Sequence, residues 1–370
     1  MRNAPAARPT TAALDTAPYI TFWETTRACD LACKHCRACA QPVRDLRELS
    51  TEEGFQLLTE IRALGCPLLV LTGGDPAKRH DLLELVQYGH GIGLRMALTP
   101  SATPLLTPEL LKELHGRGLA RLALSLDGLE ETHDSFRGVR GAYPLTLQLL
   151  EAARAIGLTT QINTSVGYHN RHELPQLARL VEALSPELWS VFFIVPTGRA
   201  SQTHMLSAEH TEEVLTFLAA RVREVRHDIK TTAAPHFRRV LMTNKQDLDA
   251  IVGLGSDGIA RHARGINDGQ GVAFISHIGD IYPSGFLPIA CGNVREEGLT
   301  ATYREHPLFT RLRDPDQLRG KCGACPFKRV CGGSRARAHG MTGDPFAEDP
   351  VCAYVPPGYK HKRLSVLRGA

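Results

Sequence analysis

The sequence has no long hydrophobic run. It contains no stretch of about 18 apolar residues, so no membrane span is expected. Residues 1–17 are mostly polar and lack the apolar core of a signal peptide, so we expect a flexible leader and a cytoplasmic protein. Internal repeats are also absent. The net charge is only +4, which gives no reason to expect nucleic acid as a partner.

What the chain does have is ten cysteines in 370 residues. The cytoplasm keeps thiols reduced, so disulfides do not explain them. Eight fall into two groups, which are Cys29, Cys33, Cys36 and Cys39 near the start and Cys322, Cys325, Cys331 and Cys352 near the end. Two groups at opposite ends of the chain predict two metal sites.

The first half alternates strand-like and helix-like segments. Short apolar runs predict strands at Tyr19–Trp23, Leu68–Leu71, Arg95–Leu98, Arg121–Leu126, Thr160–Thr164 and Ser190–Val195. Ser50 with Glu53 predicts the capping box of one intervening helix, and Thr107 before Pro108 predicts the start of another. Repeated units of this length indicate a parallel sheet.

The fold class is therefore α/β. We expect a partial (β/α)6 TIM-type barrel followed by a small Cys-rich α+β domain that a metal stabilises. A long helix is predicted near Ala208–Arg226, and a hairpin is predicted to turn at His277–Asp280. The expected parts are a leader (1–17), the barrel (18–205), a helical linker region (206–265), the Cys-rich domain (266–356) and a basic tail (357–370).

The first cysteine group has the spacing Cys29-x3-Cys33-x2-Cys36, directly after the first strand. Three thiolates on one loop can hold three irons of a cubane cluster and leave the fourth iron open for chemistry. Cys33, Cys36 and Cys39 form a second plausible ligand run.

Other unusual residues follow the remaining predicted strands. In parallel barrels, function collects on the loops at the carboxyl ends of strands. These loops carry Thr72–Pro76, Thr99–Ser101, Ser125–Gly128, Asn163–Thr164 and Pro196–Arg199. Paired glycines such as Gly73 and Gly74 let the backbone approach a ligand closely.

The segment TFWETTRACDLACKHCRACA resembles the signature loop of the radical S-adenosylmethionine (SAM) superfamily. The resemblance implies that Cys29, Cys33 and Cys36 ligate a [4Fe–4S] cluster whose open iron binds SAM. It leaves Cys39 as a bystander and places His35 near the cluster without binding it. The implied reaction is reductive cleavage of SAM to methionine and a 5′-deoxyadenosyl radical, which abstracts hydrogen from a substrate.

The same resemblance implies a set of SAM contacts. Gly73, Gly74 and Asp75 look like the family's Gly-Gly-Glu-Pro element, with Asp75 in place of Glu. The remaining implied contacts are Ser125, Asp127, Asn163 and Arg137. Taken without the resemblance, Ser125–Gly128 could equally be a simple turn at the end of a strand, and Arg137 could equally be a surface charge.

The last four cysteines can saturate a second cluster or a structural zinc. The run KCGACPFKRVCGGSRARA resembles the SPASM/twitch extension of radical SAM enzymes, which implies an auxiliary [4Fe–4S] cluster. Its basic neighbours, which can offset the charge of the cluster or be ordinary solvated charges, are Lys321, Lys328, Arg329, Arg335 and Arg337. Ser284 stands where a full SPASM domain has an early cysteine, so we expect two clusters in total and a structural Cys291. Cys66 is expected to be a core thiol.

The resemblance implies a small-molecule or peptide substrate, and it favours the side chain of a tetrapyrrole. The single auxiliary cluster and compact N-terminus resemble the radical SAM enzymes of alternative haem synthesis, whereas peptide maturases often carry a peptide-binding module for which the leader has no room. Arg199, Arg335 and Arg337 are candidate partners for substrate carboxylates. A flavodoxin- or ferredoxin-type electron donor is implied. The alternatives are a peptide maturase and, from another class, a non-catalytic iron–sulfur electron carrier or a zinc-stabilised binding protein.

Overall fold

The chain folds around one large sheet, in which seven consecutive strands run parallel. The computed structural model describes residues 11–243, 253–254, 260–261 and 265–359. The parallel strands that follow one another along the chain are β1 (Ile20–Glu24), β2 (Leu68–Thr72), β3 (Arg95–Leu98), β4 (Leu119–Ser125), β5 (Thr159–Val166), β6 (Leu188–Phe193) and β7 (Asp228–Thr232). All six predicted strands are confirmed, with ends that differ by at most two residues and with Arg95–Leu98 unchanged.

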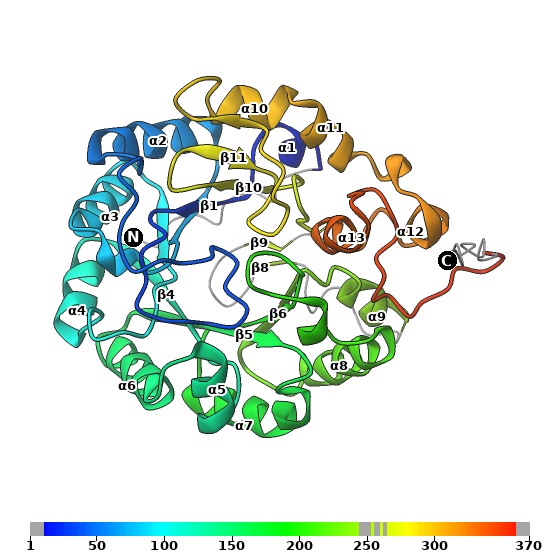
Figure 1. Cartoon of the computed structure of the whole chain (residues 1–370), viewed down its shortest axis with the longest axis horizontal. Coiled ribbons are helices and arrows are strands. Elements are labelled where there is room, and N and C mark those ends of the chain that lie inside the picture. The colour runs from blue at the N-terminus through cyan, green and yellow to red at the C-terminus, as the bar shows by residue number, and fades with distance from the viewer. Residues whose placement is uncertain (1–10, 244–252, 255–259, 262–264, 360–370) are drawn as a thin grey trace, which may run out of the picture.

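Helices surround the strands on the outside (Figure 1). They are α2 (Thr51–Leu64), α3 (Leu82–Gly91), α4 (Pro108–Gly116), α5 (Glu130–Arg137), α6 (Ala142–Ala155), α7 (Leu174–Leu184), α8 (Ala208–Arg221) and α9 (Phe237–Thr243). The predicted helix starts are confirmed: Ser50 and Glu53 form a capping box, and Thr107 accepts a hydrogen bond from the Leu110 N–H. None of the described helices is both long and apolar enough to cross a membrane.

The sheet extends beyond the six predicted units at both edges. Its order is β12-β11-β10-β1-β2-β3-β4-β5-β6-β7, so it stays open between β12 and β7 and forms a partial barrel. The predicted hairpin is confirmed as β10 (Val272–Ile275) and β11 (Asp280–Tyr282), followed by β12 (Gly292–Asn293). Unexpectedly, β10 also pairs in parallel with β1.

The part of the region 206–265 that the structure describes is only partly helical. Helix α8 ends at Arg221, earlier than predicted, and β7 then joins the sheet beside β6. Only Ile229 of β7 is buried, so this edge strand has no apolar run that would reveal it. A short two-stranded sheet, β8 (Gly253–Leu254) with β9 (Ala260–Arg261), follows. The division of the chain into domains stays a prediction.

The chain from residue 11 onward is packed against the protein, which corrects the expectation of a wholly flexible leader. Helix α1 (Thr11–Thr16) buries Leu14. The Leu14 carbonyl accepts a hydrogen bond of 2.6 Å from the Tyr303 hydroxyl, and the Asp15 carbonyl accepts one of 2.9 Å from Arg313. Residues 1–10 and most of the predicted basic tail lie outside the described residues.

Short helices fill the C-terminal part. They are α10 (Leu299–Glu305), α11 (Pro307–Arg313), α12 (Gly320–Ala324) and α13 (Arg335–Thr342). Helices α12 and α13 lie between α11 and α9, on the side where the barrel is open (Figure 1). Their apolar core is small and consists of Val195, Leu287, Leu312, Ala336 and Phe346 with a few partly buried neighbours. A core of this size agrees with the expectation that this region needs another source of stability.

Candidate functional site

The loop after β1, residues 25–41, carries the first cysteine group and is called the cysteine loop below. Cys29 and Cys33 are buried and pack with Leu31 into a small apolar cluster that Cys36 also contacts. Cys39 is exposed and has a positive φ of 50°. The fold therefore brings Cys29, Cys33 and Cys36 together and turns Cys39 away.

Hydrogen-bond donors surround the three thiols. The Leu31 N–H lies 3.4 Å from Cys29 Sγ, the Ala40 N–H lies 3.4 Å from Cys36 Sγ, and Arg137 Nη1 lies 3.8 Å from Cys33 Sγ. Burial raises the pKa of the Cys29 thiol. Donors aimed at sulfur stabilise thiolates, which are the form that binds metal.

Gly73 and Gly74 let the backbone after β2 touch the cysteine loop. A Cβ on Gly73 would lie 2.4 Å from the Thr26 carbonyl oxygen, and one on Gly74 would lie 2.4 Å from the Ala28 carbonyl oxygen. The Gly74 N–H donates to the Thr26 carbonyl at 2.8 Å. Only glycine permits this approach, so the pair has a role in holding the loop besides the expected approach to a ligand.

Asp75 is fully buried and points at the loop after β3. Its carboxylate accepts hydrogen bonds from Thr103 Oγ1 at 2.9 Å, the Ala77 N–H at 3.1 Å and the Ser101 N–H at 3.3 Å. Burial raises its pKa, and the hydrogen bonds oppose that effect. The side chain therefore links two strand-end loops.

Asp127 and Arg137 form a buried ion pair. Arg137 Nη2 lies 2.5 Å from Asp127 Oδ2, and Asp127 Oδ1 accepts from the Ser165 N–H at 2.6 Å. Burial raises the pKa of Asp127, but Arg137, His35, His133 and the Ser165 N–H together lower it to about 2. Arg137 is therefore not an unpaired surface charge. A ligand carboxylate would have to share its guanidinium with Asp127.

Ser125 ends β4, whereas Asn163 lies inside β5, three residues before its end, and the two are register partners in the β4–β5 ladder. Asn163 is buried, and its Oδ1 accepts from Gln161 Nε2 at 2.7 Å. Ser125 lies two residues before Asp127, and Asn163 lies two residues before Ser165, whose N–H donates to Asp127, so both are close along the chain to the Asp127–Arg137 site.

A stack of rings beside the cysteine loop was not foreseen from the sequence. His35 lies on Phe136 with ring centroids 4.1 Å apart, and His169 lies on its other face at 3.7 Å. Burial lowers the pKa of His35 to about 3 and that of His169 to about 4. Both rings are therefore neutral at physiological pH.

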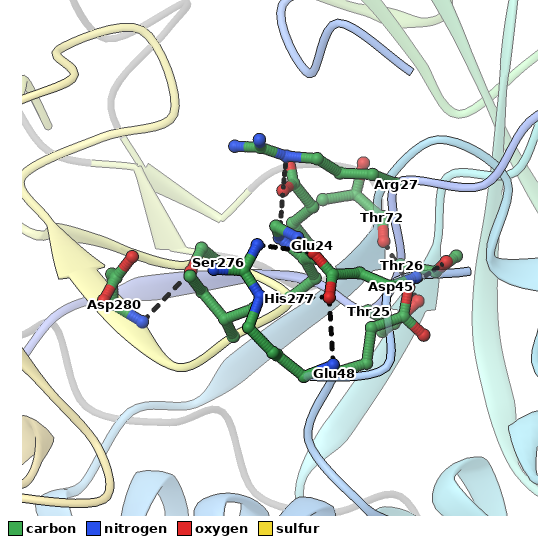
Figure 2. Close-up of polar contacts among 12 residues, drawn as sticks. Glu24, Thr25, Thr26, Arg27, Asp45, Glu48, Thr72, Ser276, His277 and Asp280 are labelled. Carbon is green, nitrogen blue, oxygen red and sulfur yellow. Dashed lines mark hydrogen bonds and ion pairs between the residues drawn. The ribbon is translucent and has the colours of Figure 1, made fainter. Parts of the chain in front are cut away.

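Glu24, the last residue of β1, forms ion pairs with residues in the cysteine loop. Figure 2 shows Glu24, Arg27 and His277 converging; Arg27 Nε donates to Glu24 at 3.0 Å, and His277 Nδ1 lies 3.1 Å from it. Arg37, just after Cys36, donates to the other carboxylate oxygen at 2.8 Å. Burial raises the pKa of Glu24, but Arg37, His277 and Arg27 lower it to about 2. The only sequence signal is a carboxylate ending an otherwise uncharged strand.

The second cysteine group lines a single pocket. Besides Cys322, Cys325, Cys331 and Cys352, its lining includes His236, Arg239, Lys321, Lys328, Gly332, Gly333 and Tyr354. The Asp349 N–H lies 3.3 Å from Cys322 Sγ, and the Gly333 N–H lies 3.4 Å from Cys331 Sγ. Within the described ranges, no three His, Cys, Asp or Glu side chains are arranged to hold a single metal ion.

Two of the basic residues near this pocket are buried, which corrects their reading as solvated charges or substrate partners. Arg335 donates to the carbonyls of Pro345 at 2.9 Å and Ala347 at 2.6 Å, and reaches Cys322 Sγ at 3.5 Å. Arg337 pairs with the buried Asp349 at 2.9 and 2.8 Å. Lys328 and Arg329 instead face Asp316 at the surface. Neither buried arginine is free for a substrate carboxylate.

Arg199, the third candidate, is exposed beside the cysteine loop. Its backbone N–H donates a hydrogen bond to the Cys36 carbonyl at 3.0 Å. Burial lowers the pKa of its guanidinium, but a hydrogen bond to Cys36 and the nearby thiolates raise it overall.

The single cysteines lie in the core. Cys66 and Cys291 are buried in the main hydrophobic cluster, and burial raises their pKa values to about 11 and about 12. Ser284 donates a short hydrogen bond to Asp268. The expectation that Cys66 is a core thiol is confirmed, and the structural role of Cys291 stays a prediction.

Comparison with known proteins places the chain in one family. The profile of the radical SAM superfamily matches residues 23–181. An AdoMet-dependent heme synthase of Methanosarcina barkeri is 37% identical over 345 residues, which cover 93% of this chain and 99% of that protein. A PqqA peptide cyclase of Bradyrhizobium diazoefficiens is 28% identical, covering 92% of this chain and 87% of that protein.

The fold agrees. SuiB of Streptococcus suis, solved with bound S-adenosylmethionine, superposes with a TM-score of 0.68 at 17% identity, covering 92% of this chain and 78% of that chain. The chain therefore belongs to the radical SAM superfamily of enzymes.

Proposed function

We propose that Cys29, Cys33 and Cys36 hold the [4Fe–4S] cluster that the family uses with SAM. Support comes from the convergence of these three thiols on one buried face of the loop, with Cys39 turned to solvent. With SAM on its open iron, such a cluster supplies a one-electron cleavage that yields a hydrogen-abstracting radical. The residues of the chain orient SAM, keep water out and hold the loop in place.

The SAM site is proposed to lie between the cysteine loop and the ends of β2, β4 and β5. Gly73, Ser125 and Asn163 remain the proposed direct contacts, with Arg137 and Asp127 acting as one neutral pair. Gly74 and Asp75 are proposed to shape the site, because their hydrogen-bonding groups are engaged by neighbouring loops.

The second cysteine group is proposed to hold an auxiliary [4Fe–4S] cluster in a SPASM/twitch-type region. Four thiols line one pocket, and Lys321, Arg239 and Arg335 bring positive charge to it. Four thiolates saturate the cluster, which favours electron transfer over substrate binding. A structural zinc is the alternative, and iron and zinc analysis of the purified protein distinguishes them.

The substrate is proposed to be a tetrapyrrole, from whose side chain the enzyme abstracts hydrogen as an oxidoreductase. The observation that carries this proposal is the 37% identity to an AdoMet-dependent heme synthase over nearly the full length of both proteins, against 28% to a peptide cyclase. A flavodoxin- or ferredoxin-type protein would supply electrons in the cytoplasm, and no nucleic acid or membrane is involved.

Anaerobic turnover tests the substrate class. The reconstituted enzyme, SAM and a strong reductant are incubated with iron-coproporphyrin, and the tetrapyrrole is analysed by mass spectrometry. Loss of mass from its propionate side chains, in step with 5′-deoxyadenosine, supports the proposal. An unchanged tetrapyrrole, with 5′-deoxyadenosine formed at the substrate-free rate, contradicts it.

A further inference from the structure

A buried histidine lies in the wall of the auxiliary pocket without a polar partner. His236 directly precedes α9, is 1% exposed and lines the same pocket as the four cysteines. Neither of its ring nitrogens has a hydrogen-bond partner among the described residues. Buried polar groups nearly always have one, so these two nitrogens point to a ligand of the pocket.

The residues around the His236 ring do not supply the missing hydrogen bonds. The carboxylate of Asp349 is close to the ring, but its Oδ2 lies 4.0 Å from Nδ1, too far for a hydrogen bond. Asp349 is itself occupied by Arg337 and by the Ser334 N–H at 2.8 Å. The centroid of the Phe193 ring lies 6.5 Å from that of His236.

The imidazole is neutral in this environment. Burial, with smaller contributions from Arg337 and Arg239, lowers the pKa of His236 to about 4, and Asp349 opposes this shift. A neutral imidazole has one N–H donor and one acceptor nitrogen, and no hydrogen bond fixes which is which. A sulfur atom in the pocket is an acceptor and would select the nitrogen that carries the proton.

We propose that His236 donates a hydrogen bond to a sulfur atom of the auxiliary cluster and thereby raises its reduction potential. The inference rests on the auxiliary cluster proposed above. Reduction adds negative charge to the cluster, and a donor aimed at sulfur stabilises that charge. Backbone N–H groups already reach Cys322 and Cys331, so His236 adds a side-chain donor that substitution can remove.

The experiment uses full-length protein in which Cys29, Cys33 and Cys36 are replaced by Ala, so that only the auxiliary site can hold iron. In this background, H236L removes the donor, whereas H236Q keeps one. The matched control is H227L, because His227 is also buried but lies beside Trp189, outside the auxiliary pocket. Iron and sulfide content are measured first, and the reduction potential is then titrated by electron paramagnetic resonance.

We expect H236L to shift the potential to more negative values, with H236Q and H227L close to the parent. Loss of iron in H236L, with iron retained in H236Q, also supports a donor role. A fully loaded H236L with the parent potential would overturn the inference, as would loss of iron in both His236 variants. If the C29A/C33A/C36A parent itself binds no iron, the proposal of an auxiliary cluster is refuted. This result differs from the others because it is seen before any His236 variant is made.

Discussion

Single buried carboxylates control the cysteine loop, and Glu24 is the clearest case. Its carboxylate contacts Arg27 and also His277 from the hairpin turn (Figure 2). It further contacts Arg37, just after Cys36. Breaking a buried, hydrogen-bonded charge pair costs about 3–5 kcal/mol, whereas exposed pairs contribute about 0–1 kcal/mol. The loop therefore depends on a residue that does not ligate iron.

We predict that E24Q destabilises the protein by about 3 kcal/mol and weakens iron retention at the first site. The charge of the carboxylate is lost while its shape is kept, so Arg27 and Arg37 lose their counter-charge. Urea unfolding and iron analysis measure the two effects. The control is E53Q, because the Glu53–Arg295 pair is partly exposed and Gln keeps the capping box. Equal stability of E24Q and E53Q would contradict the role of Glu24.

The ring stack gives a pH dependence with a definite sign. The pKa of His169 is about 4 in the folded protein and near 6.5 when unfolded, so between these values the unfolded chain binds more protons. Stability therefore falls as the pH drops below 6.5. H169F keeps the stack on Phe136 and removes the titration. Going from pH 7.5 to pH 5.5, the wild type should lose about 1 kcal/mol more than H169F in urea unfolding. Parallel loss in both proteins would show that His169 is not the group responsible.

The sequence does not reveal supporting residues such as Glu24 and His236, because their partners come close only in the folded chain. The ligand candidates were found because cysteine spacing is local and chemically specific. Glu24 meets His277 across more than 250 positions, and His236 meets the cysteines of the auxiliary pocket only after folding. The roles of Arg335 and Arg337 stayed open in the sequence because no local pattern reveals that their partners are backbone carbonyls and Asp349.

At the scale of elements, the contact between the loop after β2 and the cysteine loop depends on glycine. We predict that G74A lowers iron binding at the first site and leaves the auxiliary iron in place. The added Cβ would lie 2.4 Å from the Ala28 carbonyl oxygen, so the cysteine loop has to move. Iron analysis in a background without Cys322 and Cys325 isolates the first site.

The matched control is G91A, at the end of α3, where a Cβ meets no atom within 4 Å. Alanine is a better helix former than glycine, so G91A should be neutral or stabilising by up to about 1 kcal/mol. Normal iron loading of G74A would mean that the loops tolerate the displacement.

Element types were predictable where apolar runs or caps marked them. The six strands and the starts of α2 and α4 agree with their sequence signals. Strand β7 was missed because it buries one side chain at the sheet edge. The pairing of β10 with β1 was missed because parallel pairing between distant segments has no local sequence signature.

For the whole molecule, the two cysteine groups make separable predictions. C322A/C325A should lose about half of the iron, because only one of two clusters is removed, and should retain part of the SAM cleavage activity. The C-terminal region should also become more sensitive to proteolysis, since its own apolar core is small. Complete loss of iron at both sites in this variant would mean that the two sites are not independent.

The central claim is that Cys29, Cys33 and Cys36 hold the cluster at which SAM is cleaved. Its most direct test is anaerobic formation of 5′-deoxyadenosine by iron-loaded wild type, by C29A/C33A/C36A and by C39A. The account predicts product from wild type and C39A and none above background from the triple variant. Product from an iron-loaded triple variant, or its loss in a fully loaded C39A, would contradict the assignment.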